Sequence, residues 1–385
     1  MRSYYEFFAG GGMARAGLGP GWKCLFANDF DHRKGATYRL NWGDGELRTQ
    51  DVALVDAGDL TIPADLIWGS FPCQDLSLAG GGAGLKGDRS GTFWPFWKIV
   101  TELRAQERSP KIIALENVIG TLHSHNGKDF ASICNELHQA GYKFGAIVVD
   151  AVLFVPQSRP RLFIIGIRKD LSWPKNLFRK GPSLVWHSRA LLSAYEKLPE
   201  DTSQSWVWWE MPPPPRRNVG FSELVEHNPT GVRWHSPAET QRILDLMSGV
   251  NLAKIEAAKC ASLSSGRQLV GGIYRRTRLD ENGFKVQRAE VRFDDVAGCL
   301  RTPAGGSSRQ LIAVVDGKSV RTRLISSRET ARLMGLPDHY ILPDNYNEAY
   351  HLTGDGVVVP VVRYIAENIF EPLLSDESLI EAEAA

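Results

Sequence analysis

Three side chains that could act as a nucleophile, an acid or a base follow short apolar segments of this sequence. Cys73 comes after the apolar run 66–68 and the stiff ring of Pro72. Asp29 and Glu116 come near the ends of two other segments that are typical of strands. Ligands of open parallel sheets bind beyond the carboxyl ends of the strands. The sequence therefore predicts one shared site, although an isolated Pro-Cys pair more often marks a buried structural cysteine.

The composition bounds the class of protein. The 385 residues are 43% hydrophobic and 23% charged, which is typical of a soluble globular chain with two domains or one large domain with an insertion. No apolar run is long enough to span a bilayer, and no apolar signal segment is present. The five cysteines are an odd, widely spaced number without a Cys-x-x-Cys pair. We therefore expect reduced thiols in a cytoplasmic protein, with neither a disulfide framework nor a metal site.

The formal net charge of +1 hides an uneven distribution of charge. Residues 171–330 hold 24 Lys and Arg against 16 Asp and Glu, whereas the rest of the chain holds 21 against 28. A basic segment between acidic ones is either a solvated surface or a surface of one domain that faces phosphate groups.

The beginning of the chain has the pattern of a nucleotide-binding unit. Residues 4–8 are expected to form a strand, 9–13 a glycine-rich turn and 14–18 a short helix. Such a turn lets the backbone approach a ligand closely, and the helix N-terminus favours negative charge. A dehydrogenase would share this feature.

The second expected strand, at 23–28, ends in Asp29. An acidic residue about 20 residues beyond the glycines of such a unit commonly binds ribose hydroxyls. Phe30 is then placed either to stack on an adenine or to join the core. Asp51 borders a third short strand.

Charged side chains also lie in two connections between expected elements. The glycine-rich loop 80–84, which leads to Arg89, is either a lid over the nucleophile or an ordinary surface loop. Arg159 and Arg161 lie between strands that we expect near 145–152 and 161–167, and surface arginines are the alternative reading. Helices are expected at 92–104 and 129–140.

The alternation of strands and helices stops near residue 171. An aromatic, proline-rich patch covers 206–217, and a single helix is expected at 237–259. A compact basic cluster, 275–278, and a polar glycine turn, 305–309, follow. A helix at 328–336 is expected to end at a proline, and residues 354–362 lead into a last helix.

In this order, the motifs closely resemble those of the DNA cytosine-5 methyltransferase family. The matching segments are Phe8-Ala-Gly-Gly-Gly12, Asn28-Asp29, Ser70-Phe-Pro-Cys-Gln74 with Ser77, Asp88–Phe93, Glu116-Asn-Val118, Gln157-Ser-Arg-Pro-Arg161, Arg328–Asp338 and Gly354–Val359. The succession of Pro-Cys-Gln, Glu-Asn-Val and Gln-x-Arg-x-Arg is highly specific. Residues 171–290 match no motif, as the variable target-recognition domain of the family implies.

The sequence departs from the family pattern at a few positions. Glu6 replaces the usual aspartate at the end of the first strand, and Asp355-Gly356 replaces Asn-Ser in the last motif. Gly11 and Met13 also differ from the commoner residues.

The resemblance implies an α/β fold. We expect a Rossmann-like, doubly wound S-adenosylmethionine-dependent methyltransferase domain and a smaller, irregular, basic target-recognition domain. Residues 1–170 and 335–385 would form the catalytic domain, and residues 171–334 the target-recognition domain. The protein would act as a monomer, away from membranes, as part of a prokaryotic or viral restriction–modification system or as a descendant of one.

The resemblance also implies the site residues. Cys73 would add to carbon 6 of cytosine, so that carbon 5 can attack the methyl group of S-adenosylmethionine. Protonated Glu116 would relieve the charge at ring nitrogen 3, and Arg159 and Arg161 would hold the base, the thiolate and Glu116 in register. The residues expected at the cofactor are Phe8, Ala9, Gly10, Gly12, Asp29, Phe30, Asp51, Pro72, Asp355 and Val357.

The implied partner is double-stranded DNA. A base inside a duplex cannot reach a cysteine at a strand end, so the target must flip out, and loop 75–91 is expected to close over it. The residues expected at the DNA are Gln74, Ser77, Arg89, Arg275, Arg276, Arg278 and Arg309. A cognate restriction endonuclease need not bind directly.

Three other functions compete with this one. A cytosine-5 methyltransferase that acts on RNA would share the fold and the chemistry of Cys73. A non-catalytic DNA-binding relic of the fold would not need the intact Cys73, Glu116 and Arg161. A nucleotide-dependent oxidoreductase is suggested only by the glycine turn.

Overall fold

The computed structural model describes residues 1–72, 85, 90–301 and 309–375. The chain divides into two compact units. Unit 1 comprises residues 1–150, 160–214 and 357–385, and unit 2 comprises residues 151–159 and 215–356. The chain thus passes between the units four times, and both of its ends belong to unit 1.

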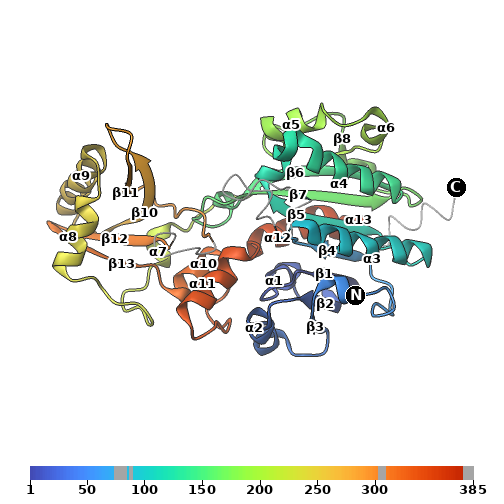
Figure 1. Cartoon of the computed structure of the whole chain (residues 1–385), viewed down its shortest axis with the longest axis horizontal. Helices are drawn as coiled ribbons and strands as arrows, with labels where there is room; N and C mark the ends of the chain where they lie inside the picture. Colours follow the sequence, from blue (N-terminus) through green and yellow to red (C-terminus); the bar gives the residue numbers. More distant parts are fainter. Residues whose placement is uncertain (73–84, 86–89, 302–308, 376–385) are drawn as a thin grey trace. The chain divides into compact units, whose positions relative to one another are not determined.

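Unit 1 is built on a seven-stranded sheet of order β3-β2-β1-β4-β5-β7-β6 (Figure 1). The first five strands in this order, β3, β2, β1, β4 and β5, are parallel, whereas β7 runs antiparallel to its neighbours β5 and β6. The strands are β1 (Arg2–Phe7), β2 (Trp22–Asp29), β3 (Leu47–Thr49), β4 (Leu66–Gly69), β5 (Ile112–Val118), β6 (Tyr142–Asp150) and β7 (Pro160–Arg168). This mostly parallel sheet confirms the predicted α/β class.

Helices cover both faces of this sheet, which makes it doubly wound. One face packs on the apolar sides of α3 and α4 through residues such as Phe7, Ile67 and Leu115. On the other face, Trp68 contacts Phe370, and helix α1 packs on α12. The helices are α1 (Met13–Leu18), α2 (His32–Trp42), α3 (Phe93–Ala105), α4 (Lys128–Gln139), α12 (Val359–Ile365) and α13 (Glu371–Leu373).

The segment 171–214 belongs to unit 1, whereas the sequence analysis placed it in the target-recognition domain. It contains α5 (Arg189–Tyr195), α6 (Glu200–Ser203) and the short pair β8 (Phe178–Arg179) and β9 (Trp208–Trp209). Trp206 packs edge-on against Phe144 of β6 and Phe130 of α4. These aromatic contacts attach the segment to the sheet of unit 1. The chain boundaries of the units therefore fall at 150/151, 159/160, 214/215 and 356/357, whereas the sequence predicts two boundaries, at 170/171 and 334/335.

Unit 2 contains a four-stranded antiparallel sheet of order β11-β10-β12-β13 that the sequence analysis did not predict. Its inner face packs on α9 through Ile273, Val291, Leu311 and Ala313. The strands are β10 (Leu269–Leu279), β11 (Lys285–Arg292), β12 (Leu311–Asp316) and β13 (Ser319–Leu324). The helices are α7 (Phe221–Leu224), α8 (Pro237–Asp245), α9 (Gly249–Ser265), α10 (Ser327–Leu333) and α11 (Tyr346–Asp355).

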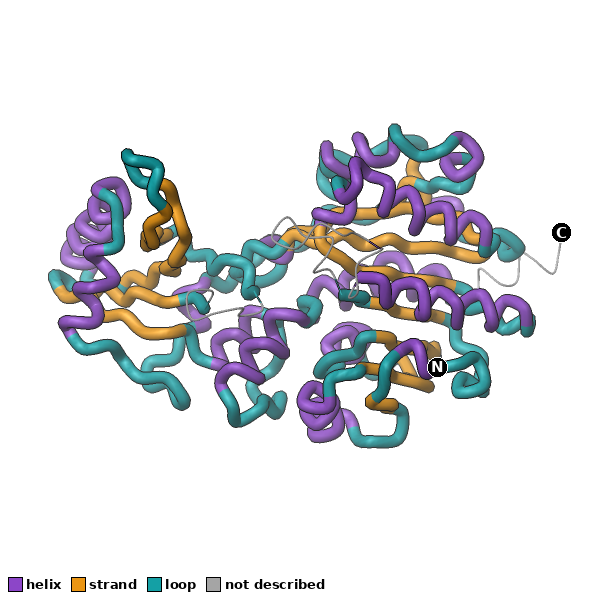
Figure 2. The backbone as a smooth tube through the Cα atoms, viewed as in Figure 1, coloured by secondary structure: helices purple, strands orange, loops and turns teal. Residues whose placement is uncertain are grey.

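The helix predicted at 237–259 is two helices, α8 and α9 (Figure 2). The chain between them bridges to the edge of β11, where Met247 pairs with Ala289. Ser248 then adopts an extended conformation as the N-cap of α9. This local pairing interrupts a hydrophobic pattern that would otherwise suit one helix. Within the described part of the chain, no helix is both long and apolar enough to cross a membrane.

Candidate functional site

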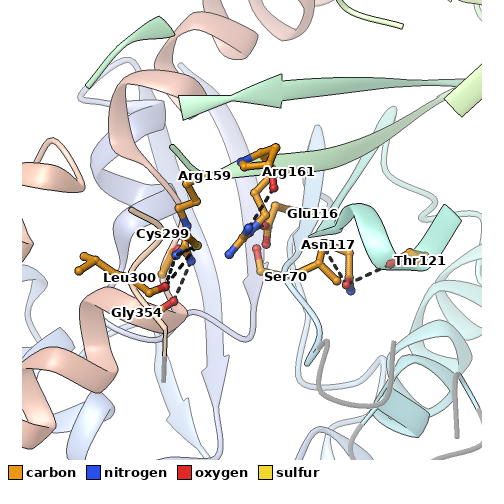
Figure 3. Close-up of polar contacts among 12 residues, drawn as sticks. Ser70, Glu116, Asn117, Thr121, Arg159, Arg161, Cys299, Leu300 and Gly354 are labelled. Carbon is orange, nitrogen blue, oxygen red and sulfur yellow. Dashed lines mark hydrogen bonds and ion pairs between the residues drawn. The ribbon is translucent and has the colours of Figure 1, made fainter. Parts of the chain in front are cut away.

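The segment that follows β4 is hydrogen-bonded to the end of β5. The bond is made at Phe71, two residues before Cys73. The two strands are parallel neighbours, with Gly69 beside Leu115. Beyond them, the side-chain amide of Asn117 donates to the carbonyl of Phe71 at 3.1 Å, and Thr121 Oγ1 donates to Asn117 Oδ1 at 3.2 Å (Figure 3). Asn117 is buried. The path of the chain toward Cys73 is therefore fixed relative to Glu116, the residue before Asn117.

Glu116 and Arg161 form an ion pair on one face of the sheet. Arg161 of β7 stands opposite Val118, so it is the diagonal neighbour of Glu116 on the same face. Arg161 Nε lies 3.2 Å from Glu116 Oε1, and the side chains are only 17% and 9% exposed. Figure 3 shows the two groups pointing toward one another near Ser70. A carboxyl group is thus held by a partly buried cation beside the strand end that leads to Cys73.

The glycine turn after β1 has the backbone geometry that its sequence predicts. Gly10 and Gly12 have φ values of +55° and +76°, in the region that favours glycine. A Cβ built on Gly10 would meet no atom of the described residues within 4 Å. Phe8 also has a positive φ, of +59°, which is unusual for a bulky residue and marks a constrained turn. The backbone at Gly10 therefore borders open space into which a ligand could fit.

Asp29 links this turn to the end of β2. Its Oδ2 accepts a hydrogen bond from the Gly10 N–H at 2.8 Å, and its Oδ1 accepts one from the Asp31 N–H at 2.8 Å. The side chain is 6% exposed, and burial raises the pKa of its carboxyl group. Each oxygen keeps a further lone pair for a ligand hydroxyl. The sequence analysis assigned Asp29 to ribose but did not predict its hydrogen bond to the turn.

The other predicted cofactor residues of unit 1 lie in different settings. Phe30 is 68% exposed, so its ring is not part of the core. Asp51 caps the turn after β3 by accepting from the Ala53 N–H at 2.9 Å. Pro72 is half-buried, and Val357 is buried. Asp355, the remaining residue, is exposed at the end of α11 in unit 2.

Arg159 donates to the backbone of unit 2. It is 2% exposed. Its Nη1 lies 2.9 Å from the Leu300 carbonyl, and its Nη2 lies 2.8 Å from the carbonyls of both Gly354 and Gly356 (Figure 3). Gln157 acts similarly: its amide nitrogen donates to the Leu333 carbonyl at 2.8 Å. These contacts connect the short segment 151–159 to three distant parts of unit 2.

The basic residues predicted at the DNA are in unit 2, on or beside its sheet. Arg275, Arg276 and Arg278 lie on β10, and Arg309 precedes β12 with its guanidinium 5.8 Å from the ring centre of Tyr346. Burial and the charge of Arg309 lower the pKa of Arg275. Each cation disfavours the charged form of the other, so an anion bound beside them would be stabilised.

Four predicted site residues lie outside the described residues, so the structure does not place them. They are Cys73, Gln74, Ser77 and Arg89. Most of loop 75–91, the expected lid, is outside as well.

Two site features escaped the sequence analysis because their partners are backbone groups. Asn117 is the middle residue of Glu-Asn-Val, yet its target is the Phe71 carbonyl. Arg159 alternates with Arg161 in sequence, but it donates to carbonyls more than 140 positions away. A side chain that binds a distant carbonyl leaves no pairing signal in a single sequence. The one available sign was an uncharged polar residue inside an apolar strand.

A family model described as C-5 cytosine-specific DNA methylase matches residues 3–371. Type II methyltransferase M.HhaI of Haemophilus parahaemolyticus is 27% identical over 369 residues, which cover 95% of this chain and 93% of that protein. Type II methyltransferase M.HpaII of Haemophilus parainfluenzae is 26% identical over 392 residues, which cover 96% of this chain and 90% of that protein.

Solved structures share the fold. The Entamoeba histolytica methyltransferase EhMeth aligns with a TM-score of 0.65 at 14% identity, covering 97% of this chain and 99% of that chain. The S. pombe Dnmt2 methyltransferase aligns with a TM-score of 0.59 at 15% identity, covering 97% and 100%. With the family model spanning nearly all of the sequence, the chain belongs to the C-5 cytosine-specific DNA methylase family.

Proposed function

We propose that the protein transfers a methyl group from S-adenosylmethionine to carbon 5 of a flipped-out cytosine in a short sequence of double-stranded DNA. The observation that carries this proposal is the buried Glu116–Arg161 pair, fixed by Asn117 to the strand end that leads to Cys73. A nucleophile and a carboxyl group on adjacent strand ends are what addition to a cytosine ring requires.

The residues of unit 1 fit the proposed cofactor. The open space at Gly10 allows close approach of a ligand to the backbone, and the exposed ring of Phe30 offers a surface for stacking. Asp29 has lone pairs left for ribose hydroxyls, and Asp51 lies beyond the adjacent strand end. Phe8, Ala9, Gly12, Pro72 and Val357, which also belong to unit 1, would complete the site. Bound S-adenosylmethionine supplies an electrophilic methyl group.

Each catalytic residue then has a separate task. The Cys73 thiolate forms a bond to carbon 6 of the cytosine, which makes carbon 5 nucleophilic. Glu116 in its protonated form donates to ring nitrogen 3 as negative charge develops there. Arg161 steadies Glu116 and the base oxygen, whereas Arg159 acts by positioning, through the backbone carbonyls that it holds. After methyl transfer, a water molecule takes the proton from carbon 5, and Cys73 leaves carbon 6 as a thiolate.

Unit 2 would read the target. It carries 21 Lys and Arg against 16 Asp and Glu, whereas unit 1 carries 24 against 28. A basic unit favours contact with phosphate groups, and its arginines can bind base edges. The names of the relatives, type II methyltransferases, support a role beside a restriction endonuclease. We expect the protein to act as a monomer.

The test is bisulfite sequencing of an unmethylated plasmid incubated with the protein and S-adenosylmethionine. Methylcytosine is expected at one short recurring sequence. Cys73→Ser should abolish it, whereas Cys260→Ser, which alters an exposed cysteine of α9, should not.

Two results would contradict the proposal. Folded protein that leaves the plasmid unmethylated but methylates transfer RNA would favour the RNA enzyme. Methylation that survives Cys73→Ser would remove the proposed nucleophile.

A further inference from the structure

Strands β10 and β11 extend as a two-stranded ribbon beyond the sheet of unit 2 (Figure 2). β10 pairs with β12 only from Leu269 to Ile273, whereas its pairing with β11 continues to Leu279. The six unshared residues span about 20 Å at the usual rise of a strand. The turn is closed by Asp280, whose carboxylate accepts from the Asn282 and Phe284 N–H groups. A two-stranded ribbon of this kind can enter the major groove of DNA.

One face of the ribbon carries most of its charge. Ile273 and Val291 point to the core beneath α9. Because side chains alternate along a strand, Arg276, Arg278, Arg288 and Glu290 lie on the opposite face. This face therefore holds three cations and one anion.

Glu290 binds two of these arginines at once. Arg278 donates from Nε at 2.8 Å and from Nη2 at 2.5 Å to Oε1, while Arg276 Nε lies 3.4 Å from Oε2. Arg278 stands opposite Val286, four residue pairs away from the Tyr274–Glu290 pair, so its side chain runs back along the strand to reach the carboxylate. The arginine side chains are 50% exposed and Glu290 is 30% exposed. Exposed ion pairs are weak, so a DNA contact can replace this one.

A carboxylate in this position competes with DNA for the arginines. Every duplex offers phosphates, and each phosphate contact that forms must first displace Glu290. A guanine edge carries no net charge, and Arg278, which holds Glu290 with Nε and Nη2, keeps Nη1 for such an edge. Glu290 therefore opposes phosphate contacts, which every duplex offers, more than it opposes contacts to base edges.

We propose that Glu290 is a specificity-determining residue, which holds Arg276 and Arg278 back from phosphate groups but leaves them able to bind base edges. This inference rests on the proposed function, because it assumes a sequence-specific DNA substrate. The simpler alternative is that Glu290 only stiffens the ribbon.

The test compares Glu290→Gln with Glu256→Gln. Both remove one negative charge from unit 2, but Glu256 lies on α9, behind the other face of the sheet, where it pairs with Lys259. The probes are a 30-base-pair duplex that contains the site found by bisulfite sequencing and a duplex of the same composition with that site scrambled. Affinity for both is measured from low to physiological salt, and thermal unfolding reports stability.

Glu290→Gln is expected to bind the scrambled duplex roughly three- to tenfold more tightly at low salt, with a salt slope steeper by about 0.9. Binding to the site should gain less, so the ratio of the two affinities falls. The double variant Glu290→Gln/Arg278→Gln restores the net charge of this face and should return the salt slope toward that of the unaltered protein.

Other outcomes would overturn the inference. An equal gain for both duplexes, or no greater gain than with Glu256→Gln, would mean that Glu290 does not affect discrimination. A lower unfolding temperature with unchanged binding would make it a structural residue. Because binding of the scrambled duplex requires no catalysis, this result is separable from failure of the proposed reaction, in which no site would be found.

Discussion

At the scale of single residues, three buried carboxyl groups of unit 1 differ in their surroundings. Glu116 has a partly buried arginine beside it, Asp29 is held by two backbone N–H groups, and Glu6 is 1% exposed in the middle of the sheet. Burial disfavours the charged form, and cations or N–H donors favour it. The surroundings of each carboxyl group differ, and those of Glu116 and Glu6 lead to two different predictions.

Replacing Glu116 by glutamine should remove the acid without changing the shape of the site. We expect the rate of methyl transfer to fall by about 10²- to 10⁴-fold, the usual contribution of general acid catalysis, while duplex binding changes little. Single-turnover kinetics and a binding titration measure the two effects. Glu102→Gln on the surface of α3 is the control, and a Glu116→Gln enzyme with normal turnover would exclude the assigned role.

Glu6 should make stability fall as pH rises. Burial raises the pKa of its carboxyl group to about 8, against the opposing effect of Arg15. The folded state therefore retains this proton between about pH 4.5 and 8 while the unfolded state loses it. Over that window the contribution to the free energy of unfolding declines by up to about 1.4 kcal/mol per pH unit. Glu6→Gln should lose this dependence.

Denaturant titrations at pH 5, 6.5 and 8 would measure this effect. The variant should gain stability relative to the unaltered protein as pH rises. A constant difference across the three values would mean that Glu6 ionises normally.

At the scale of elements, the glycine turn between β1 and α1 links backbone conformation to the proposed cofactor. Gly10 and Gly266, the C-cap of α9 in unit 2, have similar positive φ values of +55° and +63°, and at both a Cβ would meet no described atom within 4 Å. Substitution by alanine thus imposes a similar backbone strain of about 1 kcal/mol at each. Only the Cβ on Gly10 would enter the proposed cofactor site.

Gly10→Ala should therefore weaken binding of S-adenosylhomocysteine at least tenfold, while Gly266→Ala should leave it unchanged. Calorimetric titration measures both affinities, and thermal unfolding shows whether the two stability losses match. Equal affinities in the two variants would place the cofactor away from this turn.

The elements differ in how well the sequence predicts them. Strands β1, β2 and β4 were predicted within a few residues because each is an apolar run that ends at turn residues. The sheet of unit 2 was not predicted, since β10 and β11 are rich in arginine along their exposed ribbon. The break between α8 and α9 depends on pairing with β11, which no local pattern reports. Likewise, the site residues that belong to a motif were predicted. The contacts of Asn117 and Arg159 with distant backbone carbonyls were not.

At the scale of the whole molecule, each unit has its own hydrophobic core. One core surrounds the sheet of unit 1, and the other lies between α9 and the sheet of unit 2. In unit 2, Arg323 and Glu329 also form an ion pair in which both side chains are 0% exposed. Separate cores allow separate unfolding transitions.

Glu329→Gln should selectively destabilise unit 2, because it leaves the charge of Arg323 buried without its counter-ion. Breaking a buried pair costs about 3–5 kcal/mol, whereas Asp338→Asn, which breaks the exposed pair with Arg332, should cost less than about 1 kcal/mol. Scanning calorimetry should show one transition lowered and the other unchanged. A uniform shift of the whole profile would indicate that the units unfold together.

The backbone contacts of Gln157 and Arg159 bear on how such a protein can acquire a new target sequence. The oxygen atoms in unit 2 to which they donate are the backbone carbonyls of Leu333, Leu300, Gly354 and Gly356, a group that every residue type possesses. Substitutions at these positions during evolution can therefore leave the hydrogen bonds to the backbone carbonyls in place. The same arrangement suggests how to exchange recognition modules between related enzymes: residues 215–356 can be transplanted as one piece, provided that the host keeps its own nine residues 151–159.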